Sequence, residues 1–110
     1  MTVKIDKRRY LLVRLLGNKP KRAEFDKEIR KIVRYFYGEL TLIWSNLHIV
    51  DEWNDFFIIR TNHRYVDQIE AAITIMWSED FIADIICKSG TIKGLKRRFK
   101  NLFETASVSS

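Results

Sequence analysis

Residues 8–16, RRYLLVRLL, decide how the chain folds. Tyr10, Leu11, Leu12 and Val13 follow one another, so both faces of an extended chain would be apolar at this point. A strand of this kind lies inside a sheet that is covered on both sides. We therefore expect residues 8–16 to form the first strand, buried on both faces.

After this strand, the spacing of apolar residues indicates further helices and strands along the chain. GNKPK at 17–21 indicates a loop. Apolar residues at helical spacing predict a helix over 23–37 that ends at Gly38, and a second one over about 64–78. The remaining segments are expected to be strands at 40–50, 56–61 and 81–88, a polar hairpin turn at 51–55, and a last helix at about 91–103.

This order, β-α-β-β-α-β plus a C-terminal helix, predicts an α+β, ferredoxin-like fold that is related to the RRM and has an antiparallel sheet. Its sheet order is 4-1-3-2, and the two long helices cover one face. The last helix is expected to cover part of the other face, which is apolar because of Tyr10, Leu12, Trp44 and one of Phe56 and Phe57.

Length and composition suit one domain. The chain has 110 residues, of which 46% are hydrophobic. We expect residues 1–104 to form the domain and TASVSS at 105–110 to be a flexible tail. The single cysteine, Cys87, excludes an internal disulfide and is expected to be a small buried hydrophobic residue. No transmembrane helix or signal peptide is recognisable, so we expect a cytoplasmic protein without membrane contact.

The charge is unevenly distributed. The net charge is +6, but residues 1–22 hold eight basic side chains and one acid, and residues 85–103 hold six basic side chains and no acid. The middle, residues 23–84, has twice as many acids as bases. The chain therefore has a mildly acidic body and two basic ends, a pattern that points to a polyanionic partner.

The ferredoxin-like order brings the two basic ends together, because the first strand starts where the fourth strand ends. The last helix also carries Lys93 in its first turn, where the helix dipole disfavours a cation. A phosphate bound by Lys93 and the backbone N–H groups of the Ser89–Thr91 turn would explain this placement, although Ser89 and Thr91 also suit ordinary N-capping. Gly90 is expected to supply an unusual backbone angle, and Gly94 a close approach of nucleic acid.

Catalytic and metal sites are not indicated. His48, His63 and Cys87 show no ligand spacing, and there is no phosphate loop or dinucleotide motif, so no cofactor is expected. Asp51, Glu52 and Asp55 are expected to form a turn rather than a metal site. Trp53 is either exposed there or folded back on its own sheet. The third strand has no RNP1 pattern, so we do not expect bases to stack on the sheet as in RRM domains.

The chain resembles the archaeal ribonuclease P protein component 2 family, whose eukaryotic relative is the Pop five subunit. The resemblance covers roughly residues 7–103. It rests on KRRYLLVRL at 7–15, FFIIRTNHRYVDQIEAAI at 56–73, and above all SGTIKGLKRRF at 89–99. The last segment follows the family motif S-G-T-I-x-x-L-K/R-x-x-F.

The resemblance implies a ferredoxin-like subunit of ribonuclease P, the ribonucleoprotein endonuclease that trims the 5′ leader of precursor tRNA. The RNA is the catalyst in that family, so this chain would contribute no catalytic residue and would meet precursor tRNA indirectly. It would bind ribonuclease P RNA together with a TIM-barrel subunit, component 3, as a heterodimer or 2:2 heterotetramer. The expected RNA-binding residues are Lys7, Arg8, Arg9, Lys88, Ser89, Gly90, Thr91, Lys93, Lys96, Arg97, Arg98 and Lys100.

Two other functions remain open. A ferredoxin-like protein-interaction or regulatory module without RNA would show an exposed apolar patch and weak salt dependence of binding. A metal-dependent nuclease would need Asp51 and Asp55 to converge with another acid. The acidic middle, with either the second long helix or the Trp53 hairpin, is the remaining candidate surface for a protein partner.

Overall fold

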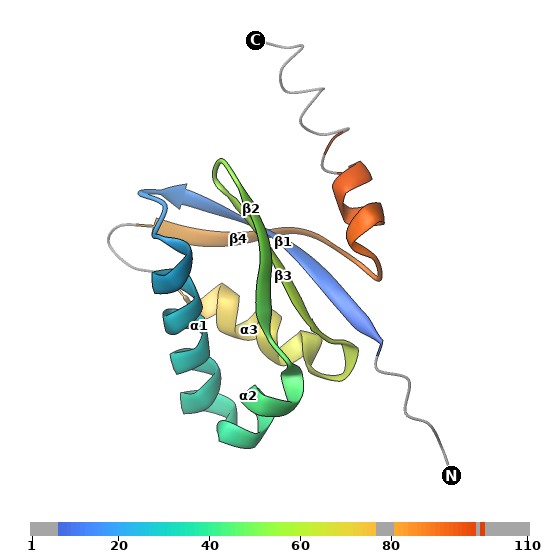
Figure 1. The fold of residues 1–110 in the computed structure, drawn as a ribbon. Coiled ribbons are helices and arrows are strands. Elements are labelled where there is room, and N and C mark those ends of the chain that lie inside the picture. The colour runs from blue at the N-terminus through green and yellow to red at the C-terminus, as the bar shows by residue number, and fades with distance from the viewer. Residues whose placement is uncertain (1–6, 77–80, 99, 101–110) are drawn as a thin grey trace.

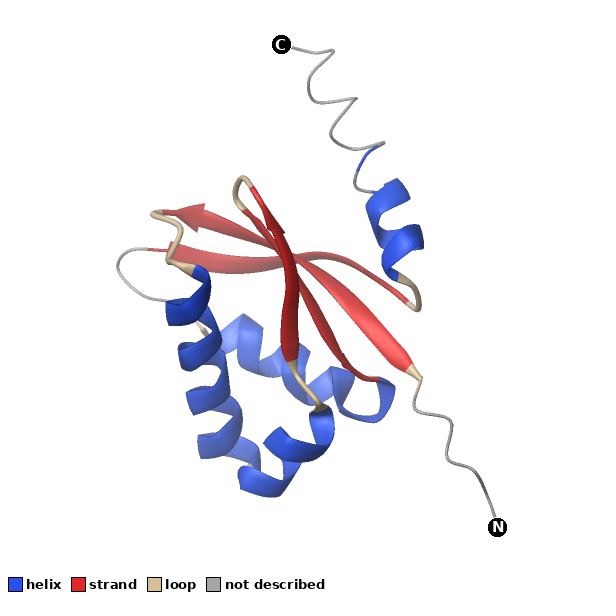
Figure 2. Cartoon of the chain, in the orientation of Figure 1, coloured by secondary structure: helices blue, strands red, loops and turns tan. Residues whose placement is uncertain are grey.

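In the part of the chain that the structure describes, a four-stranded sheet has three helices on one face and the C-terminal helix on the other (Figures 1 and 2). This computed structural model describes residues 7–76, 81–98 and 100. The elements are β1 (Arg8–Gly17), α1 (Arg22–Tyr37), α2 (Glu39–Ser45), β2 (His48–Trp53), β3 (Phe56–Asn62), η1 (His63–Tyr65), α3 (Val66–Ile75) and β4 (Phe81–Ser89). Residues 92–98 and 100 are helical and are called the C-terminal helix below.

The sheet has the predicted topology. Its strand order is β2-β3-β1-β4, and every neighbouring pair is antiparallel. Tyr10 lies opposite Ser89 and Leu11 lies opposite Lys88, so β1 starts where β4 ends. The ferredoxin-like α+β fold is confirmed, and with it the meeting of the two basic ends.

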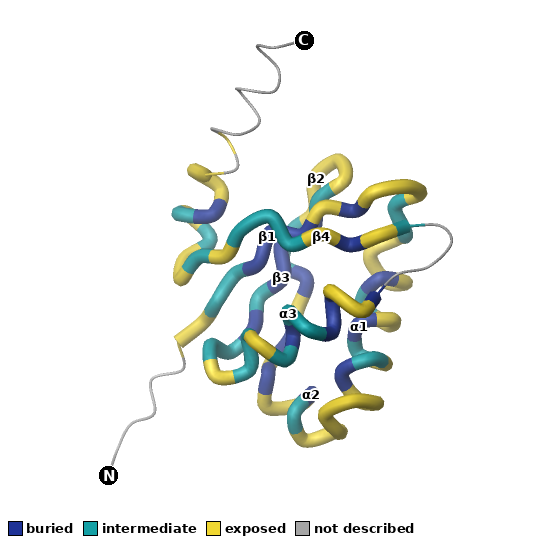
Figure 3. Tube along the Cα trace, turned by 180° about the vertical axis from the view of Figure 1, so that it is seen from behind, coloured by how far each residue is buried: buried dark blue, intermediate teal, exposed yellow. Residues whose placement is uncertain are grey.

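The central strand β1 is buried on both faces, as expected. Leu11 and Val13 belong to the main core between the sheet and the helices, whereas Leu12 belongs to a smaller core under the C-terminal helix, and each is at most 1% exposed. Figure 3 shows buried positions along both β1 and the inner sides of the helices. The main core contains a stacked pair of rings, Phe25 and Phe57, with centroids 4.7 Å apart.

The smaller core joins the C-terminal helix to what we call the second face of the sheet. Leu95 is fully buried against Leu12 and Ile58. Partly buried side chains surround these three and include Tyr10, Val50, Phe56, Ile86, Cys87 and Ile92. The prediction that the last helix covers part of an apolar second face is therefore confirmed, with Phe56 as the phenylalanine on that face.

The predicted strand at 40–50 is wrong in its first half, which forms helix α2. Gly38 has φ +90°, ends α1 by donating its N–H to Arg34, and lets a new helix begin at once. Packing decides this segment, because Leu42 and Ser45 are buried one turn apart and the Thr61 hydroxyl donates to the Ser45 carbonyl at 3.0 Å. Trp44 therefore lies on α2, 57% exposed, and not on the sheet.

The hairpin turn is shorter than predicted. Asp51, Glu52 and Trp53 belong to β2, and the turn consists of Asn54, with φ +50°, and Asp55. β2 also contains a bulge: Ile49 pairs with Ile59 and Asp51 with Ile58, so Val50 is an extra residue. Because Val50 packs on the smaller core and Asp51 lies opposite Ile58, both face the second face.

Strand β4 contains a similar bulge. Cys87 pairs with Leu12 and Ile85 pairs with Val13, which leaves Ile86 as the extra residue. Ile86 and Cys87 consequently both pack on the smaller core.

The helix predicted at 64–78 begins as η1 and continues as α3 to Ile75. Residues 77–78, the end of the last predicted helix at 101–103, and the predicted tail at 105–110 lie outside the described residues. Among the helices that the structure describes, none is long and apolar enough to cross a membrane.

Candidate nucleic-acid interface

The start of β1, the end of β4 and the C-terminal helix bring basic side chains to one corner of the sheet. We call this surface the basic corner; it consists of Lys7, Arg8, Arg9, Lys88, Lys93, Lys96, Arg97 and Arg98. Arg9 donates from Nη1 to the carbonyl of Arg8 at 3.3 Å. A Cβ placed on Gly90 would lie 3.2 Å from this Nη1 atom, so Gly90 leaves room for the guanidinium. The expected unusual backbone angle at Gly90 is wrong, since Gly90 is not among the positive-φ glycines. The missing side chain at Gly90 instead leaves space beside the Arg9 guanidinium.

Thr91 caps the C-terminal helix. Its Oγ1 accepts from the Gly94 N–H at 3.0 Å, and its own N–H donates to Ser89 Oγ at 3.3 Å. A Cβ on Gly94 would lie 2.9 Å from Thr91 Oγ1 and 3.0 Å from Ser89 Oγ. The space beside Gly94 is therefore occupied by the two hydroxyls of the cap, and two N–H groups of this turn already have acceptors inside the chain.

The cap makes a specific prediction for Gly94→Ala. In an ordinary helix this change stabilises by about 1 kcal/mol. Here the new methyl group must displace the Thr91 hydroxyl, so we expect no gain, because an N-cap is also worth about 1 kcal/mol. In a Thr91→Ala background the same change should stabilise the helix. Amide hydrogen exchange of residues 92–98 in the wild type and the three variants measures the coupling; equal effects of Gly94→Ala in both backgrounds would contradict this account.

Three of the predicted cations are held by partners within the chain. Lys88 forms an ion pair with Glu70 at 3.0 Å, and Lys96 forms one with Asp51 at 2.9 Å. Arg98 donates to the carbonyl of Lys88 at 3.2 Å, which ties the helix to β4. These three side chains contribute charge to the basic corner, but they also have structural roles.

Lys93 and Arg97 are different. Both are exposed, and within the described residues neither takes part in an ion pair or a side-chain hydrogen bond. They are four residues apart and therefore lie on one side of the helix. These two side chains are the part of the basic corner best placed for a ligand from outside.

The corner extends along the first residues of β1. Lys7 and Arg8 are exposed, and the Lys7 carbonyl accepts from the His63 N–H at 2.8 Å. Arg8 lines a hollow of about 290 Å³ with Trp44, Asn46 and Arg60. Arg60 was not predicted. Its position two residues after Ile58 in β3 puts it on the second face, but charge patterning alone gives no signal for it.

His48 lies next to Arg60 in the sheet, and its pKa reflects both its burial and the positive charge around it. Burial lowers the pKa of His48 below its usual 6.5, and the nearby Arg60 and Arg30 lower it further. The arginines, and not a charged imidazole, therefore make this edge of the sheet positive at neutral pH.

The acidic residues of the hairpin do not gather into a metal-binding group with other described residues. The Lys96 ammonium hydrogen-bonds Asp51 and lowers the pKa of that carboxyl. Glu52 forms an ion pair with Lys19 at 2.8 Å, and Asp55 lies in the turn. Within residues 7–76, 81–98 and 100, no three His, Cys, Asp or Glu side chains are arranged to hold a metal. Cys87 is half-buried, and burial raises the pKa of its thiol.

One comparison with known proteins supports the fold, and another identifies the family. A chain of the yeast ribonuclease MRP structure, determined by cryo-electron microscopy, superposes with a TM-score of 0.65 over 97% of this chain and 99% of that chain. At 10% identity, this similarity supports the fold alone. No curated protein matches the sequence. The sequence model of the Rpp14/Pop5 family matches residues 9–100, which include every strand and helix described above except the first residue of β1. The chain therefore belongs to the Rpp14/Pop5 family of ribonuclease P and MRP protein subunits.

Proposed function

We propose that this chain is a non-catalytic, RNA-binding subunit that holds the catalytic RNA of ribonuclease P and assists removal of the 5′ leader from precursor tRNA. The observation that carries the proposal is the basic corner, where cations from both ends of the sequence meet at the paired ends of β1 and β4. Family membership gives the ribonucleoprotein context. A structured RNA would be recognised through its shape and phosphates, with little base specificity.

The predicted RNA-binding residues would have different roles in RNA binding. Lys93 and Arg97 contact phosphates directly, and Lys7, Arg8 and Arg9 extend the surface along β1. Ser89, Gly90 and Thr91 shape the turn that holds Arg9 and starts the helix. Lys88, Lys96 and Arg98 position the helix and add to its positive field. Lys100 lies at the far end of the same helix.

A TIM-barrel subunit, component 3, is the proposed protein partner, in a heterodimer or 2:2 assembly. The favoured surface is the outer side of α1 and α2, which borders the basic corner where Ile43 and Trp44 line a hollow with Arg8. Large apolar side chains gather there, each at least 57% exposed: Tyr35, Phe36, Leu40, Ile43 and Trp44. A patch of this kind marks a protein interface. The same patch suits a protein-interaction module, so the test of RNA binding separates the two functions.

The test compares two double variants that each remove two positive charges. Lys93→Ala with Arg97→Ala changes the basic corner, and Lys27→Ala with Lys31→Ala changes exposed cations on α1. RNA affinity is measured against salt concentration, and precursor-tRNA cleavage is measured after reconstitution with the RNA and partner subunit.

We expect the corner variant to lower the salt slope by about 1.4–1.8, since each of the two lost phosphate contacts removes roughly 0.7–0.9 from it. Its affinity and its stimulation of cleavage should fall, and the α1 variant should behave as wild type. Equal effects of the two variants, or cleavage by the purified chain without RNA, would refute the proposal.

A further inference from the structure

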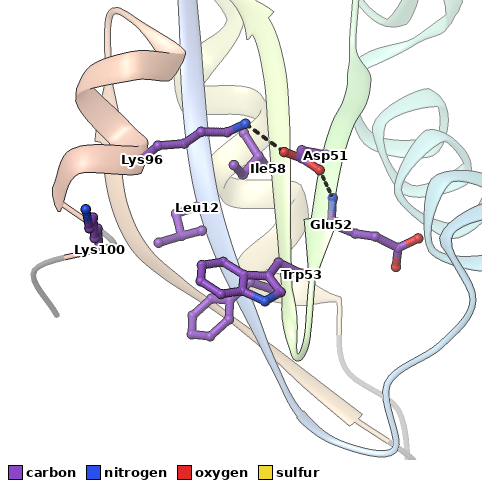
Figure 4. A pocket seen from close by; sticks show the side chains of 8 residues that line it. Leu12, Asp51, Glu52, Trp53, Ile58, Lys96 and Lys100 are labelled. Atoms are coloured by element: carbon purple, nitrogen blue, oxygen red, sulfur yellow. Dashed lines mark hydrogen bonds and ion pairs between the residues drawn. The ribbon is translucent and has the colours of Figure 1, made fainter. Parts of the chain in front are cut away.

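We propose that a cavity on the second face binds one unpaired nucleotide of RNA, with its base stacked on Trp53. The proposal rests on RNA being the partner. The cavity lies between the β2–β3 hairpin and the C-terminal helix and has a volume of about 460 Å³ (Figure 4). This volume is within the range of sites that bind small ligands. Sequence patterns gave the opposite expectation, because they showed no RNP1 motif.

The floor and one wall of the cavity are apolar and aromatic. Leu12 and Ile58 of the smaller core form the floor, and Trp53 and Phe56, paired across the hairpin, contribute rings. Trp53 is 48% exposed, and Figure 4 shows its ring beside Leu12. The Arg14 guanidinium does not line the cavity but lies 6.0 Å from the centroid of Phe56. Aromatic side chains of this kind are stacking platforms for unpaired bases.

Strand β2 also brings polar groups to the cavity. Asp51, two residues before Trp53 in β2, forms the ion pair with Lys96 of the C-terminal helix at 2.9 Å and also accepts from the Glu52 N–H at 2.9 Å, whereas the Glu52 side chain points away (Figure 4). A carboxylate has about four acceptor positions, so Asp51 retains capacity for a further donor. Cytosine and adenine present an exocyclic amino group, but uracil presents a carbonyl oxygen at the same place. The cavity should therefore prefer cytosine to uracil.

The rim of the cavity is positively charged and would therefore bind the phosphate of the same nucleotide. Lys96 and Lys100 line the cavity from the C-terminal helix, which also carries Lys93 and Arg97. An aromatic platform beside a row of cations matches how single-stranded RNA is bound. A protein side chain would use the apolar floor but not the cations, and for this reason we favour a nucleotide.

The first measurement uses Trp53 as its own reporter. Trp44→Phe and Trp77→Phe leave Trp53 as the single tryptophan of the full chain. Titration with short oligocytidylate should quench its fluorescence, and oligouridylate should bind more weakly. Asp51→Asn should reduce this preference for cytosine.

The second measurement changes the platform. Trp53→Ala should weaken oligocytidylate binding about 5- to 150-fold, the usual effect of losing one stacked base, and Trp53→Phe should restore most of it. Thermal unfolding of each variant checks the fold. Unchanged fluorescence at saturating oligonucleotide, or equal affinity of Trp53→Ala and wild type, would overturn the proposal. So would a fluorescence change caused by deleting residues 101–110 and not by RNA, since that segment would then be the occupant.

A failure of the cavity proposal can be distinguished from a failure of the proposed function. If the cavity does not bind a base, Trp53→Ala keeps wild-type affinity for structured catalytic RNA, and Lys93→Ala with Arg97→Ala still lowers it. If the chain does not bind RNA at all, both variants behave as wild type toward both kinds of RNA.

Discussion

Replacing Leu95 with alanine is expected to detach the C-terminal helix from the sheet and leave the rest of the fold intact. Leu95 is fully buried and contacts Leu12 and Ile58 in the smaller core. Truncating a buried leucine costs about 2–5 kcal/mol, which is large for a short helix held at one face. RNA affinity should fall at least about tenfold, because RNA must then redock the helix before Lys93 and Arg97 can contact it.

Amide hydrogen exchange separates this local event from global unfolding. In Leu95→Ala, exchange should speed up over residues 92–98 and stay slow in β1 and β3. Leu40→Ala, the same change at a leucine that is 59% exposed, is the matched control and should affect neither exchange nor RNA binding. An unchanged RNA affinity in Leu95→Ala would show that docking of the helix is not needed.

Replacing Phe57 with alanine should destabilise the whole domain. Phe57 is fully buried, stacks on Phe25 with ring centroids 4.7 Å apart, and has the Lys19 ammonium 4.7 Å from its own centroid. We expect a loss of about 3–5 kcal/mol in the free energy of unfolding, from the cavity left behind and from the lost ring contacts. Small domains have about 5–15 kcal/mol in total, so this variant should be close to unfolding at physiological temperature.

Urea denaturation followed by circular dichroism measures the loss directly. Phe36→Ala removes the same side chain at a position that is 57% exposed and should change the unfolding free energy by less than about 0.5 kcal/mol. Similar losses in the two variants would mean that the Phe25–Phe57 stack is not the centre of the core.

The strand order could be predicted because the apolar pattern of β1 is compatible with few positions in a sheet. A strand that is apolar on both faces must lie inside a sheet, and the order of the other elements then gives a ferredoxin-like topology. Helix α2 could not be predicted in this way. Leu40, Thr41, Ile43 and Trp44 are mostly good strand formers, and only the packing of Leu42 and Ser45 against the rest of the fold makes them helical.

The candidate site was predictable as a charge distribution but not as a set of contacts. Counting cations along the chain found both halves of the basic corner. The Lys96–Asp51 pair joins residues 45 positions apart and depends on the bulge at Val50, which no local pattern reveals. Gly94 shows the same limit: sequence suggested room for nucleic acid, whereas the structure places the hydroxyls of Ser89 and Thr91 there.

The bulges at Val50 and Ile86 have a consequence for assembly. β2 and β4 are the two edges of the sheet, and each edge strand carries one of the bulges. Unpaired edges invite other chains to add strands, and a bulge disfavours this by twisting the edge and breaking the regular spacing of its hydrogen-bonding groups. Neighbouring molecules are thus discouraged from extending the sheet into a continuous ribbon. The bulged edges therefore also protect the chain from aggregation through its strands.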